Sequence, residues 1–242
     1  MHGGRIYHVL GATGGVGAAL CRRLRAEGAG LLISARNEAQ LRALAAEIGA
    51  EAMAVDPAQA DQVEAAVDRT VSLYGRLDGA VSCVGSLLLK PAHLTTDGEW
   101  RQTIAQSLDS AFYLLRSAVK RMNGEGGSIV LVSSAAASVG LAHHEAISAA
   151  KAGLIGLALS AAASYAARRI RVNCVGPGLL DAALRARILG QDASRRVCDM
   201  MHLLRRPDEI ARAVSWLLSA EQSWVTGQLL GLDGGLNSSR TA

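Results

Sequence analysis

The sequence is short of aromatic residues and has no concentrated basic region. Phe, Trp and Tyr make up 3% of its 242 residues, with a single Phe. So few rings cannot supply the stacking platforms on which single-stranded nucleic acids bind. The net charge of +4 arises from arginine pairs scattered along the chain, which is typical of solvated surface positions. We therefore expect no nucleic-acid partner.

Cysteine is also scarce. The four cysteines, Cys21, Cys83, Cys174 and Cys198, are widely spaced and form no Cys-x-x-Cys pair. Cys83 and Cys174 lie inside apolar runs, which is typical of buried thiols. Neither a zinc site nor a disulfide framework is expected from this spacing, so we predict no metal and a reducing, cytoplasmic environment.

Long apolar runs are missing as well. The longest stretch, Ala152 to Ala163, contains Ser160 and is shorter than the roughly 18 residues that span a bilayer. The first residues of the chain show neither the apolar core nor the cleavage site of an export signal. The sequence therefore predicts no membrane segment.

What the chain does contain is a regular alternation of short apolar runs with helix-period segments. Half of its residues are hydrophobic, which excludes disorder. The predicted strands are Arg5–Leu10, Gly30–Ser34, Glu51–Val55, Gly79–Val84, Ser128–Ser133, Ile170–Val175 and Gln228–Leu232. The predicted helices are Val16–Glu27, Glu38–Ile48, Ala58–Tyr74, Glu99–Met122, Ile147–Ala167 and Asp208–Leu218. This order predicts an α/β fold in one domain over residues 1–242, a doubly wound, mostly parallel seven-stranded sheet with helices on both faces.

One segment, residues 179–204, departs from the alternation because it follows a strand but has no clear strand of its own. In doubly wound sheets the ligand crevice lies beyond the carboxyl ends of the strands. An irregular insertion at that edge is therefore a candidate substrate lid.

The first predicted strand leads into a glycine-rich loop, Gly11-Ala12-Thr13-Gly14-Gly15-Val16-Gly17, which opens the first helix. Glycines at this spacing permit a tight turn and let backbone N–H groups approach a pyrophosphate at the positive helix end. A plain turn uses glycine too, but the position between the first strand and the first helix favours nucleotide binding.

Several further motifs follow one another in an order that resembles the short-chain dehydrogenase/reductase family over essentially the whole chain. The matching motifs are the glycine loop, Val55-Asp56, Gly75-Arg76-Leu77-Asp78, Ser133-Ser134, Lys151, Arg171-Val172-Asn173, Pro177-Gly178, Val225-Thr226-Gly227-Gln228 and Asp233-Gly234-Gly235. The resemblance implies a Rossmann-type fold and an oxidoreductase that uses a nicotinamide dinucleotide.

The tip of the second strand bears on which dinucleotide is bound. A carboxylate there would accept hydrogen bonds from a free ribose 2′-hydroxyl and repel a 2′-phosphate, but the chain reads Ser34-Ala35-Arg36-Asn37. The planar guanidinium of Arg36 suits a phosphate. Alternatively, Arg36 is a solvated loop residue and Asn37 caps the next helix. We expect NADP(H) in preference to NAD(H).

The resemblance also implies individual cofactor contacts. Asp56 is expected at the adenine amino group, and Pro177, Gly178 and Leu180 are expected on the nicotinamide side. The full predicted cofactor set is Gly11, Thr13, Gly14, Gly15, Val16, Gly17, Arg36, Asp56, Gly85, Lys151, Pro177, Gly178 and Leu180.

The catalytic set departs from the family pattern. The family uses a serine, a tyrosine four residues before a lysine, and an asparagine on the preceding helix, and the tyrosine transfers the proton while the cofactor carries the hydride. Ser134 and Lys151 stand at their places, but the tyrosine position holds Ile147 and the asparagine position holds Ser107. Ser134 would also be explained as a cap of the turn that follows its strand.

A substitute for the tyrosine is available in the loop before the lysine helix. His143, His144 and Glu145 lie there, and histidine titrates near neutrality. His144 lies seven residues before Lys151, which is the spacing at which the related enoyl reductases carry their tyrosine. A polar helix start, with Glu145 at the positive end, explains the same residues equally well.

Three functions remain open on the sequence. The first is an NADP(H)-dependent oxidoreductase with a rewired proton donor, for which Ser134, Lys151, His144 and Ser107 are the candidate catalytic residues. The second is an isomerase or lyase on the same scaffold. The third is a non-catalytic dinucleotide-binding subunit that pairs with an active homologue. For assembly, the resemblance and the small residues of the lysine helix predict a homodimer or homotetramer.

Overall fold

The computed structural model describes residues 4–122, 125–178 and 206–237. Seven strands form one sheet in the order β3-β2-β1-β4-β5-β6-β7, and every neighbouring pair is parallel. The strands are β1 (Ile6–Leu10), β2 (Gly30–Ala35), β3 (Glu51–Ala54), β4 (Gly79–Ser82), β5 (Gly127–Val132), β6 (Ile170–Pro177) and β7 (Leu229–Leu232). The predicted seven-stranded Rossmann-type sheet is confirmed.

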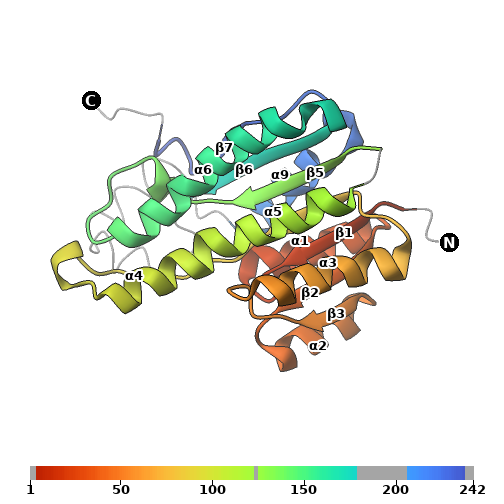
Figure 1. Ribbon diagram of the computed structural model, residues 1–242, viewed down its shortest axis with the longest axis horizontal. Coiled ribbons are helices and arrows are strands. Elements are labelled where there is room, and N and C mark those ends of the chain that lie inside the picture. Colours follow the sequence, from red (N-terminus) through yellow and green to blue (C-terminus); the bar gives the residue numbers. More distant parts are fainter. Residues whose placement is uncertain (1–3, 123–124, 179–205, 238–242) are drawn as a thin grey trace.

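Helices cover both faces of the sheet (Figure 1). They are α1 (Gly15–Ala26), α2 (Glu38–Ile48), α3 (Ala60–Tyr74), α4 (Asp97–Ile104), α5 (Ser110–Arg121), α6 (Glu145–Tyr165) and α9 (Pro207–Leu218). One apolar cluster joins α3, α5 and α6 to the sheet, and a second joins α1, α2 and α9 to its other face.

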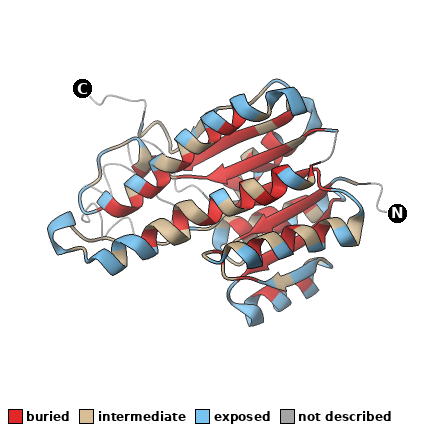
Figure 2. Cartoon of the chain, viewed as in Figure 1, coloured by how far each residue is buried: buried red, intermediate tan, exposed pale blue. Residues whose placement is uncertain are grey.

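The five inner strands are buried on both faces, as their continuous apolar runs predict, whereas the edge strands β3 and β7 are largely exposed or half-buried. In β1, Leu10 belongs to the first cluster and its neighbour Val9 to the second, because successive side chains of a strand point to opposite faces. Figure 2 shows the central strands buried while the outer helix faces are exposed. This packing fixes the carboxyl ends of the strands, where ligands bind in such sheets.

The helix predicted over Glu99–Met122 is in fact two helices joined by a π-helical turn, Ala105–Asp109. It also begins earlier, since Thr96 and Glu99 form a reciprocal capping box at the start of α4. Hydrophobic periodicity does not reveal a single wide turn, and such turns occur often at functional sites. Here the wide turn contains Ser107.

Helix α6 is more apolar than the run counted in the sequence. Together with the short turn that follows, it covers Glu145–Arg168, 24 residues that are long and apolar enough, by length and composition only, to cross a membrane. A count of uninterrupted apolar residues missed this because serines and Lys151 break the run. In the structure one side of α6 packs in the first core cluster, through residues such as Leu154 and Ala158, and 44% of the apolar window is buried.

Candidate active site

The glycine loop closes tightly against the end of β4. Gly11 has a φ of +85°, and a Cβ atom at this position would lie 2.8 Å from the backbone carbon of Cys83. A Cβ atom on Gly17 would lie 2.3 Å from the carbonyl oxygen of Gly11. Both positions therefore require glycine. Gly14 precedes α1 without a capping side chain, so the first N–H groups of the helix are left for an anion.

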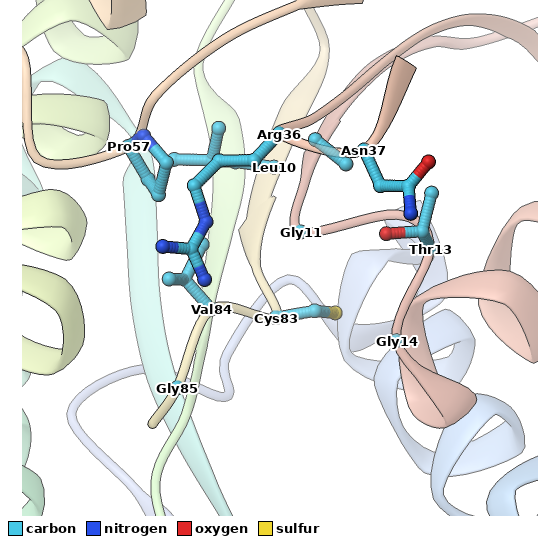
Figure 3. A pocket seen from close by; sticks show the side chains of 11 residues that line it. Leu10, Gly11, Thr13, Gly14, Arg36, Asn37, Pro57, Cys83, Val84 and Gly85 are labelled. Carbon is cyan, nitrogen blue, oxygen red and sulfur yellow. The ribbon is translucent and has the colours of Figure 1, made fainter. Parts of the chain in front are cut away.

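A cavity of about 610 Å³ opens beside this loop, at the carboxyl ends of β1, β2 and β4 (Figure 3). This volume lies within the usual range of small-molecule and cofactor sites. Its lining residues are Leu10, Gly11, Thr13, Gly14, Ala35, Arg36, Asn37, Pro57, Cys83, Val84 and Gly85. Five predicted cofactor residues thus come together here, whereas Gly15, Val16 and Gly17 form the first turn of α1 behind the loop.

Arg36 reaches across the cavity. In Figure 3 its guanidinium lies between Pro57 and Val84, while Asn37 and Thr13 lie at the other side. Within the described residues Arg36 makes no hydrogen bond or ion pair, so its donors are available. Asn37 caps α2, because its side-chain oxygen accepts a hydrogen bond from the N–H of Gln40 at 3.0 Å. The predicted helix cap is confirmed.

Asp56 lies next to the cavity but does not line it. Its carboxylate accepts a hydrogen bond from the N–H of Ala58 at 3.0 Å, and its own N–H donates to Gln62 at 2.8 Å. The residue that lines the cavity here is Pro57. Asp56 therefore shapes the turn that follows β3, and the sequence motif did not identify Pro57.

Lys151 lies buried beneath the far end of the cavity. Its Nζ donates hydrogen bonds to the carbonyl oxygens of Val132 at 2.7 Å and Val84 at 3.0 Å. Burial lowers the pKa of Lys151 from 10.5 to about 8. An ammonium group has three hydrogens, and Nζ would lie 3.3 Å from a Cβ atom on Gly85. The remaining N–H is therefore close to the Gly85 end of the cavity.

Ser134 caps a short turn at the end of β5. Its Oγ accepts a hydrogen bond from the N–H of Ala136 at 3.2 Å, as the capping interpretation predicted. A hydroxyl that accepts one bond keeps its own proton to donate, so this contact leaves Ser134 able to polarise a carbonyl. Its neighbour Ser133 is buried and donates to the carbonyl of Lys151 at 2.8 Å, which ties β5 to α6.

The position of the family tyrosine is an apolar one. Ile147 is buried in the first turn of α6 and carries no transferable proton. His144, also buried, precedes it at the start of the helix. The spacings of three residues to Ile147 and seven to Lys151 place all three side chains on one face of α6.

The tautomer of His144 follows from its contact. Nδ1 lies 2.7 Å from the carbonyl oxygen of Ala142. Because a carbonyl only accepts hydrogen bonds, Nδ1 carries the hydrogen, and Nε2 is the acceptor of the neutral ring.

The loop that carries His144 is held by the segment after β4. His143 adopts a left-handed φ of +64°, which is uncommon for residues other than glycine. Its carbonyl accepts a hydrogen bond from the N–H of Lys90 at 2.9 Å. Lys90 in turn pairs with Glu99 at 2.8 Å, and this ion pair lowers the pKa of Glu99 to about 2. Nothing in the sequence pattern had identified Lys90 as part of this site.

Ser107 lies in the π-helical turn and is buried. Its Oγ accepts a hydrogen bond from the N–H of Ser86 and lies 3.3 Å from the Ser86 hydroxyl. Ser107 therefore tethers the segment after β4. The sequence had suggested it as a candidate catalytic residue, and the contact seen here is a structural one.

The predicted nicotinamide side is described only in part. Pro177 ends β6, and the N–H of Gly178 donates to the carbonyl of Leu232 at 3.0 Å. Neither residue lines the cavity. Leu180 and the candidate lid, 179–204, lie outside the described residues.

Comparison with known proteins assigns this architecture to a family. A family model described as enoyl-(acyl carrier protein) reductase matches residues 11–237. The cis-4-hydroxycyclohexanecarboxylate dehydrogenase of Sinomonas cyclohexanicum is 36% identical over 241 residues, 96% of each chain. The 3-oxoacyl-acyl-carrier-protein reductase of Thermotoga maritima is 32% identical over 243 residues, 96% of this chain and 98% of the relative.

Solved structures agree. A short-chain type dehydrogenase/reductase from Mycobacterium ulcerans superposes with a TM-score of 0.91 at 30% identity, covering 98% of this chain and 90% of that one. A variant of actinorhodin polyketide ketoreductase, solved with NADPH, gives a TM-score of 0.90 at 25% identity over 99% of both chains. The chain therefore belongs to the short-chain dehydrogenase/reductase family of oxidoreductases.

Proposed function

We propose that this protein is an NADP(H)-dependent oxidoreductase that interconverts a carbonyl and an alcohol, with His144 in the proton-transferring role of the family tyrosine. The observation that carries the proposal is the cavity beside the glycine loop. It is lined by the glycine loop, which precedes an uncapped helix N-terminus, and by the unengaged Arg36. The buried ammonium of Lys151 lies behind its Gly85 end, 3.3 Å from where a Cβ atom on Gly85 would be.

The residues of the cavity fit a phosphorylated dinucleotide. The first turn of α1 offers backbone N–H donors to a pyrophosphate. Arg36 would hold a 2′-phosphate through its planar fork of donors. Ala35 stands beside Arg36 on the cavity wall and offers no carboxylate to a free ribose hydroxyl. The cofactor, when bound, supplies the hydride chemistry.

The remaining residues account for binding and proton transfer. The free N–H of Lys151 would donate to a ribose hydroxyl near Gly85. Ser134 would donate its proton to the substrate oxygen. His144 would accept the proton of an alcohol at Nε2 of its neutral ring, or donate one to a carbonyl from Nε2 of the protonated ring, with Nδ1–H held by the Ala142 carbonyl in both forms. Ile147 fills the place of the tyrosine with an apolar side chain, which keeps water away from that face of α6.

The test is a titration of the protein with NADPH and with NADH at one salt concentration, since both ligands are anionic and their affinity depends on salt. We expect tighter binding of NADPH, and loss of that preference in Arg36→Ala. Arg42→Ala on α2 is the matched control, because Arg42 is exposed and pairs with Glu38 away from the cavity. Equal affinities for the two cofactors would reject the NADP(H) assignment.

One observation favours a second candidate, a non-catalytic dinucleotide-binding subunit. Ile147 is well packed at the position where the family places its proton donor. A panel of carbonyls with NADPH and of alcohols with NADP⁺, followed at the nicotinamide absorbance, separates the two. Turnover with any substrate supports the enzyme. Tight NADPH binding with no turnover across the panel would make the subunit the better interpretation.

A further inference from the structure

A second cavity, of about 470 Å³, opens at the amino ends of the strands. Residues at the starts of β1 and β2 and in the last turns of α1 and α9 line it, among them Arg5, Tyr7, Arg23 and Trp216. Its volume lies within the usual range of small-molecule sites. The cavity beside the glycine loop lies at the opposite, carboxyl ends of the strands, and the two cavities share no lining residue.

The hydroxyl group of Tyr7 is an unused donor in this second cavity. Tyr7 is only 5% exposed, and it packs in the second apolar cluster. Within the described residues its hydroxyl makes no hydrogen bond, yet the oxygen is not among the fully buried polar atoms that lack a partner. The hydroxyl is therefore open to the cavity that Tyr7 lines. Burial raises the pKa of Tyr7 to about 12, so at neutral pH the hydroxyl keeps its proton and is able to donate it.

Two arginines add donors that the fold does not use fully. Arg5 is exposed, lines the cavity and makes no ion pair or hydrogen bond in the described part of the chain. Arg23 pairs with Glu27 at 2.9 Å, but its Nε is buried without an acceptor. The other carboxylate oxygen of Glu27 accepts a hydrogen bond from Ser215 at 2.7 Å. Glu27 is thus occupied by its neighbours, while Arg5 has no counter-ion.

The charges around the cavity leave an excess of positive charge. Arg212, also on the wall, pairs with Asp208 at 2.8 Å. Arg171 lies close to Arg5 and donates only to backbone carbonyls. Burial and the charge of Arg5 both lower the pKa of Arg171. Glu221 is an exposed wall residue without an ion pair among the described residues. The arginines named here and above outnumber the carboxylates by one, which favours an anion.

Trp216 gives the same cavity an apolar wall. Its side chain lines the cavity and the residue is 46% exposed. An indole ring that is open to a concave surface offers a flat face on which another planar group stacks. The cavity therefore combines a few convergent donors with one apolar surface, the usual composition of a small-molecule site.

We propose that this cavity binds a small phosphate monoester that carries a planar organic group. The guanidinium of Arg5 and the hydroxyl of Tyr7 donate to the phosphate oxygens, and Arg23 adds positive charge beside them. The planar group lies against Trp216. A phosphate has three terminal acceptor oxygens, which suits donors from separate elements better than the two oxygens of a carboxylate. This site is independent of the reaction and of the proton donor.

Phenyl phosphate is the probe, titrated into the full chain at one salt concentration and followed by isothermal calorimetry and tryptophan fluorescence. We expect saturable binding at a single site, tighter than that of inorganic phosphate, which has no ring. Arg5→Met and Tyr7→Phe should each raise the Kd by about tenfold, the effect of one hydrogen bond to a charged group. Glu221→Gln should lower the Kd by about threefold, because it removes an exposed like charge.

The variants are chosen to keep the fold, since Arg5 has no partner to lose and Tyr7→Phe keeps the ring. Arg42→Met, which removes an exposed arginine of α2 paired with Glu38, is the matched control and should leave the Kd unchanged. Arg36→Ala in the dinucleotide cavity should leave it unchanged as well.

Four results would each overturn the proposal. They are no saturable binding of phenyl phosphate, wild-type affinity in either Arg5→Met or Tyr7→Phe with native circular dichroism, loss of binding in Arg36→Ala, and binding of benzoate as tight as that of phenyl phosphate.

Discussion

The glycine loop and the start of α6 both carry predicted site residues, but they depend on different properties of the chain. The glycine loop works through its backbone: a Cβ atom on Gly11 or Gly17 would collide with neighbouring backbone atoms. The start of α6 works through side chains, and at Ile147 the fold requires only a buried side chain. A backbone site therefore persists as long as the fold does, whereas a side-chain site can change its chemistry while the packing stays intact.

Lys151 stands between the two regions. It belongs to α6, yet its ammonium is fixed by carbonyls at the ends of β4 and β5. The same carbonyls would hold it whether or not the protein catalyses a reaction. The presence of Lys151 therefore supports dinucleotide binding more directly than it supports turnover.

The largest expected effect is on the side-chain site. If His144 transfers the proton, His144→Ala should lower kcat by about 10²–10⁴-fold, the range of a positioned acid or base, with little change in the affinity for NADPH. The exposed neighbour His143 provides the control, because His143→Ala should leave the pH profile of kcat unchanged. Turnover and a pH profile that survive both substitutions would remove the histidine from the mechanism.

A second substitution tests the backbone site. Gly17→Ala places a methyl group 2.3 Å from the Gly11 carbonyl, so the loop must shift away from α1. We expect a loss of about 1–3 kcal/mol in the free energy of unfolding, measured by urea denaturation, together with weaker NADPH binding. Gly156→Ala is the control, since its methyl group meets nothing within 4 Å. Equal stability of the two variants would mean that the loop tolerates side chains.

The pH dependence of cofactor binding tests whether the ammonium group of Lys151 contributes to NADPH binding. Its pKa is lowered to about 8 by burial, so the ammonium form prevails below pH 8 and is lost as the pH rises through 8. Affinity for NADPH should therefore be highest below pH 8 and fall by about tenfold above it, a change of about 1.4 kcal/mol.

Isothermal titration across this range measures the effect. Lys151→Met should bind NADPH weakly with no step near pH 8. A step of the same size in the variant would assign the titration to another group.

The smallest effect is expected from restoring the tyrosine. In a site rebuilt around His144, Ile147→Tyr should change the turnover of simple ketones by only about threefold, because the proton already has a donor. Steady-state assays with NADPH on the wild type and the variant give the comparison. A large gain in turnover would instead show that Ser134 and Lys151 still support catalysis by a tyrosine at position 147. The chain would then be a reductase that has lost its proton donor, with no replacement by His144.

The alternation of apolar runs and helical segments predicted every strand of the sheet, with ends within two residues of those observed. Two features of the structure could not be predicted from this alternation. The π-helical turn inserts one extra residue into an otherwise regular helix, so the apolar pattern barely changes. The hydrogen bond from Lys90 to His143 joins residues more than fifty positions apart, and no local pattern in the sequence marks such a contact.

The sequence by itself determined the order of the elements, the parallel sheet, the position of the glycine loop and the absence of a tyrosine four residues before Lys151. These follow from apolar periodicity and from residue identity, which are local properties. Only the tertiary structure decided that Arg36 lines the cavity without a partner among the described residues, that Asp56 does not line it, and that Nδ1 of His144 is occupied by a carbonyl. Each of these depends on which atoms from distant segments come within hydrogen-bond distance, and packing alone sets that.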